Sequence, residues 1–154
     1  MTQSVSVVIP MCNGARFLGE TIASLRAQTI GDFPLICIDD ASADDSVDVA
    51  QAAGVTVLRN EQRQGLAANW NRAIEATQTE YFVIAHQDDV YEPEYLATML
   101  RVLESHPRAF AAHCKARTID EDGRPTAHPA ANARGCDSST RSIVARYSGS
   151  YTSS

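Results

Sequence analysis

The chain has 154 residues, of which 44% are hydrophobic and 21% are charged, and its formal net charge at pH 7 is −6. This length suits one domain with a real core, and this composition is typical of a globular protein. The acidic balance argues against a nucleic-acid binder, which is usually basic, and no apolar run is long enough to span a membrane.

Strand-like and helix-like segments alternate along the chain. In chain order, the apolar pattern predicts a strand at 4–9, a helix at 17–28, a strand at 33–38, a helix at 47–53, a strand at 55–59, a helix at 66–76, a strand at 81–85, a helix at 94–106 and a strand at 110–119. Alternation of this kind predicts an α/β fold, with a mainly parallel sheet flanked by helices on both faces.

The composition changes near Arg124. Residues 125–154 are rich in Ala, Ser, Thr and Arg, and their one short apolar patch is Ile143-Val144. No convincing strand or helix pattern lies there. We therefore expect an ordered domain at 1–124, followed by a loosely packed segment at 125–154.

The first four residues lead directly into the first predicted strand, without the basic start and long apolar stretch of a secretory signal. The four cysteines lack the spacing of a metal site; they are Cys12, Cys37, Cys114 and Cys136. We therefore expect a cytoplasmic protein whose cysteines are reduced and mostly fill the core.

Two predicted strands end on a pair of carboxylates. Asp39-Asp40 follows the second strand, and Asp88-Asp89 follows the fourth. In open α/β sheets, ligands bind at the carboxyl ends of the strands. Closely packed like charges cost stability unless a cation or hydrogen-bond donors offset them. The two pairs together predict one site for a divalent metal and a polyhydroxyl or nucleotide ligand.

Four segments, in order, resemble the motifs of family 2 glycosyltransferases. They are VIPMCNG at 8–14, IDDASAD at 38–44, NEQRQGLAANWN at 60–71 and HQDDVYEP at 86–93, the last resembling a DxD-type metal motif. Cys12 stands where the family commonly has an aromatic residue, and Ala41 where it usually has glycine. The resemblance covers about residues 5–123 and implies a GT-A fold. Segment 87–91 is similar to that of rhamnosyltransferase-type members.

This resemblance implies roles in binding a nucleoside. Asp40 would accept a hydrogen bond from the uracil or thymine ring of a nucleotide-sugar. Pro10, Met11 and Asn13 would form the wall around that base. Asn71 matches the family's asparagine, and we expect it to brace a loop or to contact the ligand.

The resemblance also implies a metal site. Asp88 would contact ribose or sugar hydroxyls, and Asp89 would bind Mg²⁺ or Mn²⁺, which bridges the diphosphate oxygens. For the neighbouring residues we favour ordinary roles. Asp39 is expected to cap or support a loop, Trp70 to lie in the core, and His86 to be structural.

The implied reaction is inverting sugar transfer, from a UDP- or dTDP-sugar to a hydroxyl of a polysaccharide or lipid-linked glycan, as in cell-wall polysaccharide synthesis. The family's catalytic base lies in a second half with no recognisable counterpart here, so we expect a truncated fold that is the donor-binding half of such an enzyme. Apolar faces meant for that second half would favour a homodimer. A lipid-linked acceptor would place the intact protein at the inner face of the membrane.

Other classes fit less well. The loop at 10–15 lacks the GxGxxG of a dinucleotide-binding domain and the glycine-rich basic loop of a sugar nucleotidyltransferase. A phosphoacceptor domain carries its acidic pair after the first strand. A non-catalytic module that binds nucleotide-sugars remains the alternative, because it would share every donor-site residue.

Overall fold

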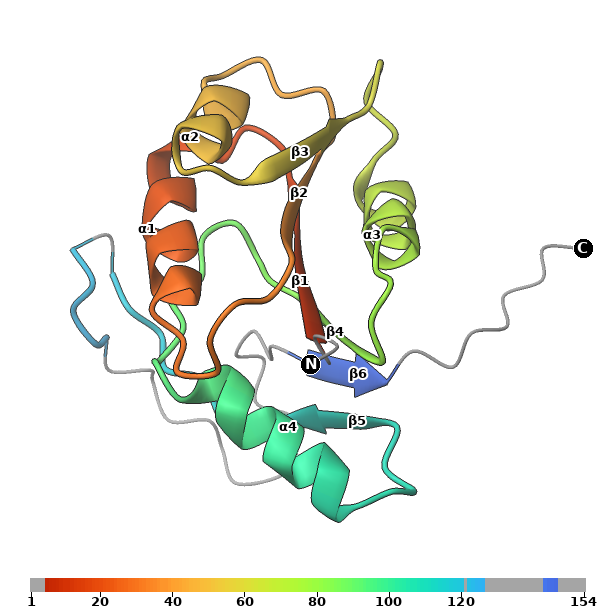
Figure 1. Ribbon diagram of the computed structural model, residues 1–154. Helices are drawn as coiled ribbons and strands as arrows, with labels where there is room; N and C mark the ends of the chain where they lie inside the picture. Colours follow the sequence, from red (N-terminus) through yellow and green to blue (C-terminus); the bar gives the residue numbers. More distant parts are fainter. Residues whose placement is uncertain (1–4, 121, 127–142, 147–154) are drawn as a thin grey trace, which may run out of the picture.

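The computed structural model describes residues 5–120, 122–126 and 143–146, which form one layered unit around a single sheet (Figure 1). Its strands are β1 (Val5–Met11), β2 (Leu35–Asp39), β3 (Thr56–Arg59), β4 (Tyr81–Ile84), β5 (Ala111–His113) and β6 (Ile143–Arg146). Its helices are α1 (Ala15–Arg26), α2 (Ser46–Ala52), α3 (Leu66–Glu75) and α4 (Tyr95–Ser105). The strand order is β3-β2-β1-β4-β6-β5.

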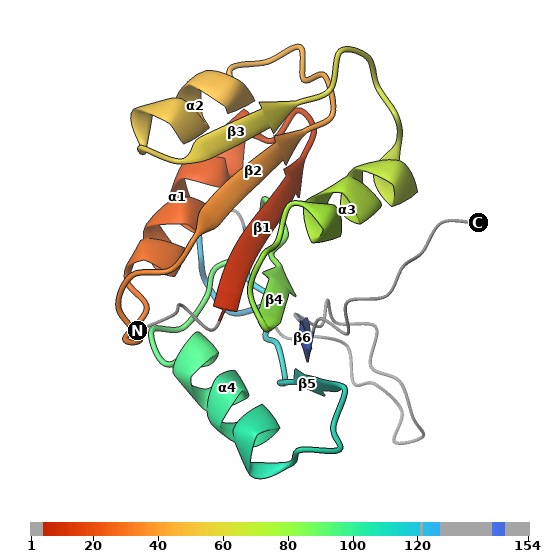
Figure 2. The same ribbon diagram turned by 45° about the vertical axis from the view of Figure 1, so that its right-hand side comes forward.

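The first four strands are parallel, which confirms the predicted α/β class. β1 pairs with β2 on one side and with β4 on the other, and β3 extends the sheet beyond β2. Parallel strands covered on both faces are apolar throughout, which matches the buried sequence of β1. Helices α1 and α2 lie on one face of the sheet and α3 on the other (Figure 2).

The core divides between these two faces because side chains alternate along β1. Val7 and Ile9 join the larger cluster, to which α1 and α4 contribute buried residues such as Leu18 and Leu96. Val8 joins a smaller cluster with Ile38 and Ala73, under α3. The larger cluster fixes α1 against the sheet, and α1 begins directly after the loop that follows β1.

The far edge of the sheet differs from the prediction. The predicted strand at 110–119 is reduced to Ala111–His113, and Ile143–Arg146, where no strand was expected, forms β6 between β4 and β5. Both of its pairings are antiparallel. The apolar patch of this strand, Ile143-Val144, is only two residues long, and the partners of the strand lie far away in the sequence. Most of 125–154 lies outside the described residues, so the division of the chain at Arg124 stays a prediction.

Two smaller findings bear on location and chemistry. None of the helices in the described part of the chain is long and apolar enough to cross a membrane. Cys12, Cys37 and Cys114 are free thiols, and of these Cys37 is buried while the other two are partly exposed. Cys136 lies outside the described residues. Burial raises the pKa of Cys37 to about 12, helped by the charge of Asp39, so this thiol stays protonated.

Candidate functional site

A cleft of about 320 Å³ opens at the carboxyl ends of β1, β2 and β4, beside the start of α3. We call it the edge cleft. Its lining comes from the loops that carry the sequence motifs, and consists of Pro10, Met11, Cys12, Asp40, Arg63, Leu66, Asn69, Trp70, His86, Gln87 and Asp88. The volume lies in the range of small-molecule sites, roughly 300–1,000 Å³. The two acidic pairs thus meet at one edge, as the sequence predicts.

Asp40 is buried and accepts three hydrogen bonds from the loop that follows β3. Its Oδ1 accepts from the backbone N–H of Gln64 at 2.7 Å and from Nδ2 of Asn60 at 2.8 Å. Its Oδ2 accepts from the N–H of Gly65 at 2.9 Å. Burial raises the pKa of Asp40, but these bonds and the charge of Arg63 outweigh it and hold the pKa below its ordinary value. An ionised carboxylate therefore holds this loop over the edge cleft.

Asn60 extends this network into α3. Its Nδ2 also donates to Oδ1 of Asn69 at 3.1 Å, its Oδ1 accepts a hydrogen bond from Arg72, and Asn69 Nδ2 donates to the carbonyl of Ile38 at 2.9 Å. Buried polar groups of this kind are stable only when each has partners. The network joins β2, the loop after β3 and α3 into one support.

The structure gives Asn71 and Asn69 different surroundings. This side chain is exposed on α3 and does not line the edge cleft, whereas Asn69 is buried and does. The two positions differ by about 200° around a helix, because each residue turns the chain by about 100°. The bracing role expected of Asn71 is therefore performed by Asn69.

The loop after β1 is locked to the loop after β2. The N–H of Asn13 donates to Oγ of Ser42 at 2.9 Å, and its side-chain Oδ1 accepts from the N–H of Ala43 at 2.8 Å. Asn13 and Ala41 both have positive φ, at 52° and 54°. Asn13 is exposed and outside the lining of the edge cleft, unlike Pro10, so it braces this loop and does not face the cleft.

Asp39 has the supporting role expected from the sequence. It is fully buried, with Oδ2 3.1 Å from Nε of Arg59, and both of its oxygens accept from the N–H of Ser42. Arg59 also donates to the carbonyl of Ser42 at 2.8 Å. This carboxylate is directed at the protein, so it is not available to a ligand.

Gln87 ties the loop after β4 to the loop after β1, and the sequence analysis does not single it out. Its Oε1 accepts from the N–H of Cys12 at 2.9 Å, and its Nε2 donates to the Cys12 carbonyl at 3.3 Å. A Cβ at Gly14 would lie 2.4 Å from Gln87 Oε1, so a side chain there would displace this amide. In the sequence, Gln87 lies within the motif at 86–93, directly before an acidic pair, but nothing there indicates a bond to the Cys12 backbone.

The second acidic pair is not satisfied in this way. Asp88 is exposed and lines the edge cleft, while Asp89 is half-buried and is not among the lining residues. Burial raises the pKa of Asp89, and the charge of Asp88 raises it further against the opposing effect of His86. This pair carries the kind of repulsion that a bound cation would relieve.

The structure corrects the expected place of Trp70. It lies in the wall of the edge cleft, half-buried, with its ring edge-to-face against His86 at 5.4 Å between centroids. Leu66 lies one turn earlier in the same wall and is 74% exposed. The apolar residues at the start of α3 thus face the cleft instead of the core.

The side chains that could ligate a divalent metal ion are few. Within the described residues, no group of three or more His, Cys, Asp or Glu side chains is placed to hold a metal ion. Asp88 and Asp89 supply carboxylate oxygens, and Mg²⁺ is usually held by one or two carboxylates plus waters and substrate phosphates. The residues present therefore fit a metal that a phosphate ligand helps to bind.

Comparisons with known proteins agree with this geometry. The family model described as Glycosyl transferase family 2 matches residues 6–150. The chain is 34% identical over 104 residues to the putative glycosyltransferase EpsH of Bacillus subtilis, covering 65% of this chain and 30% of that protein. It is 28% identical over 109 residues to glycosyltransferase GlyG of Streptococcus pneumoniae, covering 68% and 36%. The chain thus spans about a third of the length of these curated relatives.

Solved structures share the fold. The mannosyltransferase PcManGT of Pyrobaculum calidifontis, in complex with GDP-Man and Mn²⁺, superposes with a TM-score of 0.68 at 23% identity, covering 74% of this chain and 36% of that one. TarS of S. aureus, in complex with UDP, gives a TM-score of 0.64 at 21% identity, covering 68% and 33%. These likenesses establish a GT-A fold.

Proposed function

Because this chain belongs to glycosyl transferase family 2, we propose that it binds the donor of an enzyme that transfers sugar from a UDP- or dTDP-sugar. The acceptor is a hydroxyl of a polysaccharide or lipid-linked glycan. The observation that carries this proposal is the edge cleft, where Asp40, Trp70 and Asp88 meet at the carboxyl edge of a parallel sheet.

In this proposal the base of the nucleotide lies against Pro10 and Met11 and is recognised by Asp40. An ionised carboxylate offers about four acceptor positions, and three of those of Asp40 are taken by protein donors. The remaining one suits the ring N3–H of uracil or thymine. Adenine has no matching N–H there, so the same geometry disfavours adenine nucleotides.

The diphosphate lies toward the loop after β4, where Asp88 and Asp89 would hold Mg²⁺ or Mn²⁺. When bound, such an ion supplies charge neutralisation to the departing nucleoside diphosphate. Arg63, which lines the edge cleft from the loop after β3, adds a positive charge on the opposite wall. The acceptor hydroxyl attacks the anomeric carbon, the bond to the diphosphate breaks, and the configuration inverts. No residue of this chain is assigned as the base for the hydroxyl proton.

Calorimetric titration of the full chain with UDP, dTDP, GDP and ATP tests the donor assignment. With Mn²⁺ present, UDP and dTDP should bind more tightly than GDP or ATP, and a chelator should weaken all four. Equal UDP affinity with Mn²⁺ and with chelator would show that no metal ion takes part in UDP binding. If ATP binds as tightly as UDP, Asp40 does not recognise the base.

A non-catalytic nucleotide-sugar-binding module is the second candidate, and it rests on the absence of an assigned base. Incubation with UDP- and dTDP-sugars, Mn²⁺ and a panel of lipid-linked acceptors separates the two, because only the enzyme forms product. Association with the inner face of the membrane and with a second copy also belongs to the proposal. Vesicle sedimentation and light scattering, respectively, would test them.

A further inference from the structure

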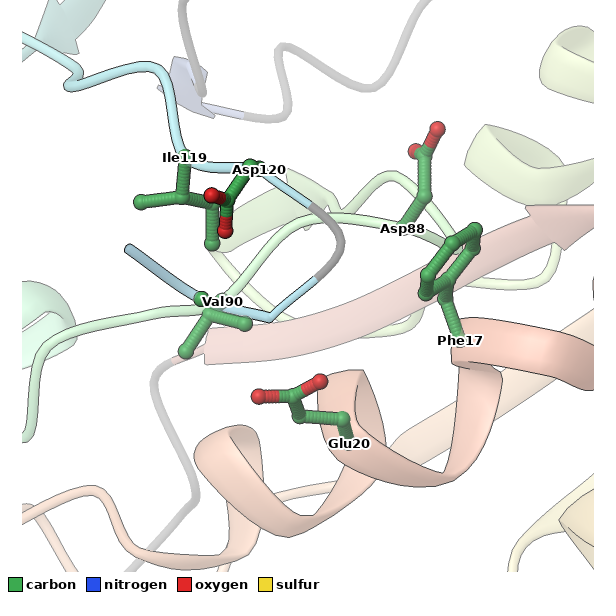
Figure 3. A pocket seen from close by; sticks show the side chains of 7 residues that line it. Phe17, Glu20, Asp88, Val90, Ile119 and Asp120 are labelled. Carbon is green, nitrogen blue, oxygen red and sulfur yellow. The ribbon is translucent and has the colours of Figure 1, made fainter. Parts of the chain in front are cut away.

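A second hollow, of about 220 Å³, lies beside the edge cleft (Figure 3). We call it the acidic hollow. Its lining comes from three separate segments and consists of Phe17, Glu20, Asp88, Val90, Ile119, Asp120 and Gly123. Asp88 is the one residue that also lines the edge cleft. The two hollows therefore meet at this carboxylate.

The walls of the acidic hollow are held by regular structure on one side and a bonded turn on the other. Phe17 and Glu20 lie on α1 at i and i+3, which places them on the same helix face. In the turn, the Asp120 N–H donates to the Arg124 carbonyl at 2.9 Å, and Asp120 Oδ1 accepts from the Arg124 N–H at 2.9 Å. Gly123 completes the turn with positive φ. These bonds fix the shape of the turn that forms this wall.

Its charge selects the ligand. Three carboxylates line it, those of Glu20, Asp88 and Asp120, and in Figure 3 Glu20 and Asp120 flank the hollow from different segments. Among the described residues that line this hollow there is no Lys, Arg or His. Ionised carboxylates only accept hydrogen bonds. Those of Glu20 and Asp120, which hold no metal in the proposed function, therefore favour a ligand with several hydroxyl donors and repel acidic sugars.

The rest of the wall is apolar. Phe17, Val90 and Ile119 contribute it, and the last two are 47% and 38% exposed. An apolar wall with a few convergent polar groups is typical of sites for small organic ligands. The three carboxylates of this hollow do not form a group that could hold a metal ion by themselves in the described part of the chain.

We propose that the acidic hollow binds a neutral sugar ring of the acceptor and discriminates against acceptors whose terminal ring is acidic. This proposal rests on the proposed function, because the shared Asp88 brings an acceptor close to the donor only if the donor lies in the edge cleft. The volume, which is smaller than that of the edge cleft, suits one ring and not a nucleotide.

The test is an amide chemical-shift titration of the full chain, saturated with UDP and Mg²⁺. The probes are methyl glycosides of glucose, N-acetylglucosamine, mannose and rhamnose, with methyl glucuronide as the acidic counterpart of the glucoside. At least one neutral glycoside should shift the amides of Phe17, Val90 and Gly123, and bind about tenfold more tightly than the glucuronide. If UDP shifts Met11 and Trp70 but no neutral glycoside shifts the acidic hollow, or if the glucuronide binds equally well, the inference is wrong. Failure of UDP itself would instead overturn the donor proposal.

A pair of variants tests whether the preference for neutral glycosides comes from the acidic hollow or from the net charge of the protein. Glu20→Lys places a cation in the acidic hollow and should reverse the preference between the neutral glycoside and the glucuronide. Glu104→Lys makes the same charge change at an exposed site on α4 that lines neither hollow. It should leave the preference unchanged. Equal effects of the two variants would show that net charge, and not the acidic hollow, sets the preference.

Discussion

The loop after β2 and the loop after β4 carry the same dipeptide, Asp-Asp, but use it differently. Asp39 and Asp40 are buried, and protein donors and Arg59 satisfy their oxygens. Asp88 is exposed, and Asp89 is half-buried, so that burial, and to a smaller extent the charge of Asp88, raises the pKa of Asp89. The first pair holds the loops that shape the edge cleft, and the second pair presents uncompensated charge to it. Identical sequence signals can therefore differ in structural role. The first pair is built into the fold, with one acceptor position of Asp40 left for the proposed base, whereas the second pair is not.

Removal of one carboxylate from each pair should change the free energy of unfolding by very different amounts. Asp40→Ala should lower the free energy of unfolding by about 3 kcal/mol, because two backbone N–H groups and the Asn60 amide lose their acceptor. Asp88→Ala should change the free energy of unfolding by less than about 0.5 kcal/mol, as is usual for an exposed position, but weaken UDP binding. Urea unfolding measures the first effect and calorimetry the second. Equal stability of the two variants would contradict the distinction between support and ligand site.

The second largest effect concerns the metal. Asp89→Ala should cost about 2 kcal/mol of UDP binding free energy in Mn²⁺, because the diphosphate charge loses its neutralising ion. In a chelator, the variant and the parent should bind UDP alike. Asp48→Ala, an exposed position on α2 outside both hollows, serves as the control. A variant that keeps the full response to Mn²⁺ would exclude Asp89 as the metal ligand.

Stability should depend on pH with opposite signs for the two pairs. The folded-state pKa of Asp40 is below its ordinary value, so its contribution is present above the unfolded pKa of about 3.9 and is lost as the pH falls further. Asp40→Asn should flatten the acid limb of the stability curve. The folded-state pKa of Asp89 is raised, so in chelator its contribution is lost as the pH rises above that value. Asp89→Asn should then raise stability at pH 7, which urea unfolding across the pH range would detect.

The smallest expected effect concerns Ala41, in the loop after β2. Ala41 has φ of 54°, a left-handed conformation that costs a residue with a Cβ about 1 kcal/mol or more. Ala41→Gly should therefore stabilise the fold by about 1 kcal/mol without changing UDP affinity. Ala43→Gly is the matched control two residues away, where φ is not positive, and it should be neutral or slightly destabilising. Thermal unfolding of the two variants decides the matter.

The sequence predicted the parallel half of the fold well. The strands β1 to β4 and the helices α1 to α4 lie within a few residues of their predicted bounds, because the sequence shows an apolar run or an apolar helix face at most of them. β6 was missed because its apolar patch, Ile143-Val144, is only two residues long and because its pairing with β4 depends on sequence far away. Long-range pairing is a property of the tertiary fold, and no local pattern carries it.

Within the site, the sequence located the carboxylates better than their supports. Strand ends are readable from apolar runs, so Asp40 and Asp88 could be placed at one edge. The sequence favoured Asn71 because it matches the family's asparagine, whereas the structure places Asn69 in the lining of the edge cleft, and a ligand contact of Asn71 stays a prediction. Gln87 escaped notice because an amide that bonds backbone groups leaves no pattern of its own.

The insertion of β6 between β4 and β5 has a consequence for how the chain folds. In the described sheet, β5 pairs only with β6, although α4 and β5 precede β6 by about thirty residues. During synthesis, β1 to β4 can assemble while the outer edge of β4 still lacks its neighbour, and an open strand edge is prone to pair with other chains. We expect pulsed hydrogen exchange to show protection of β1 amides before those of β5. The arrival of Ile143–Arg146 would then be the step that closes this edge of the sheet.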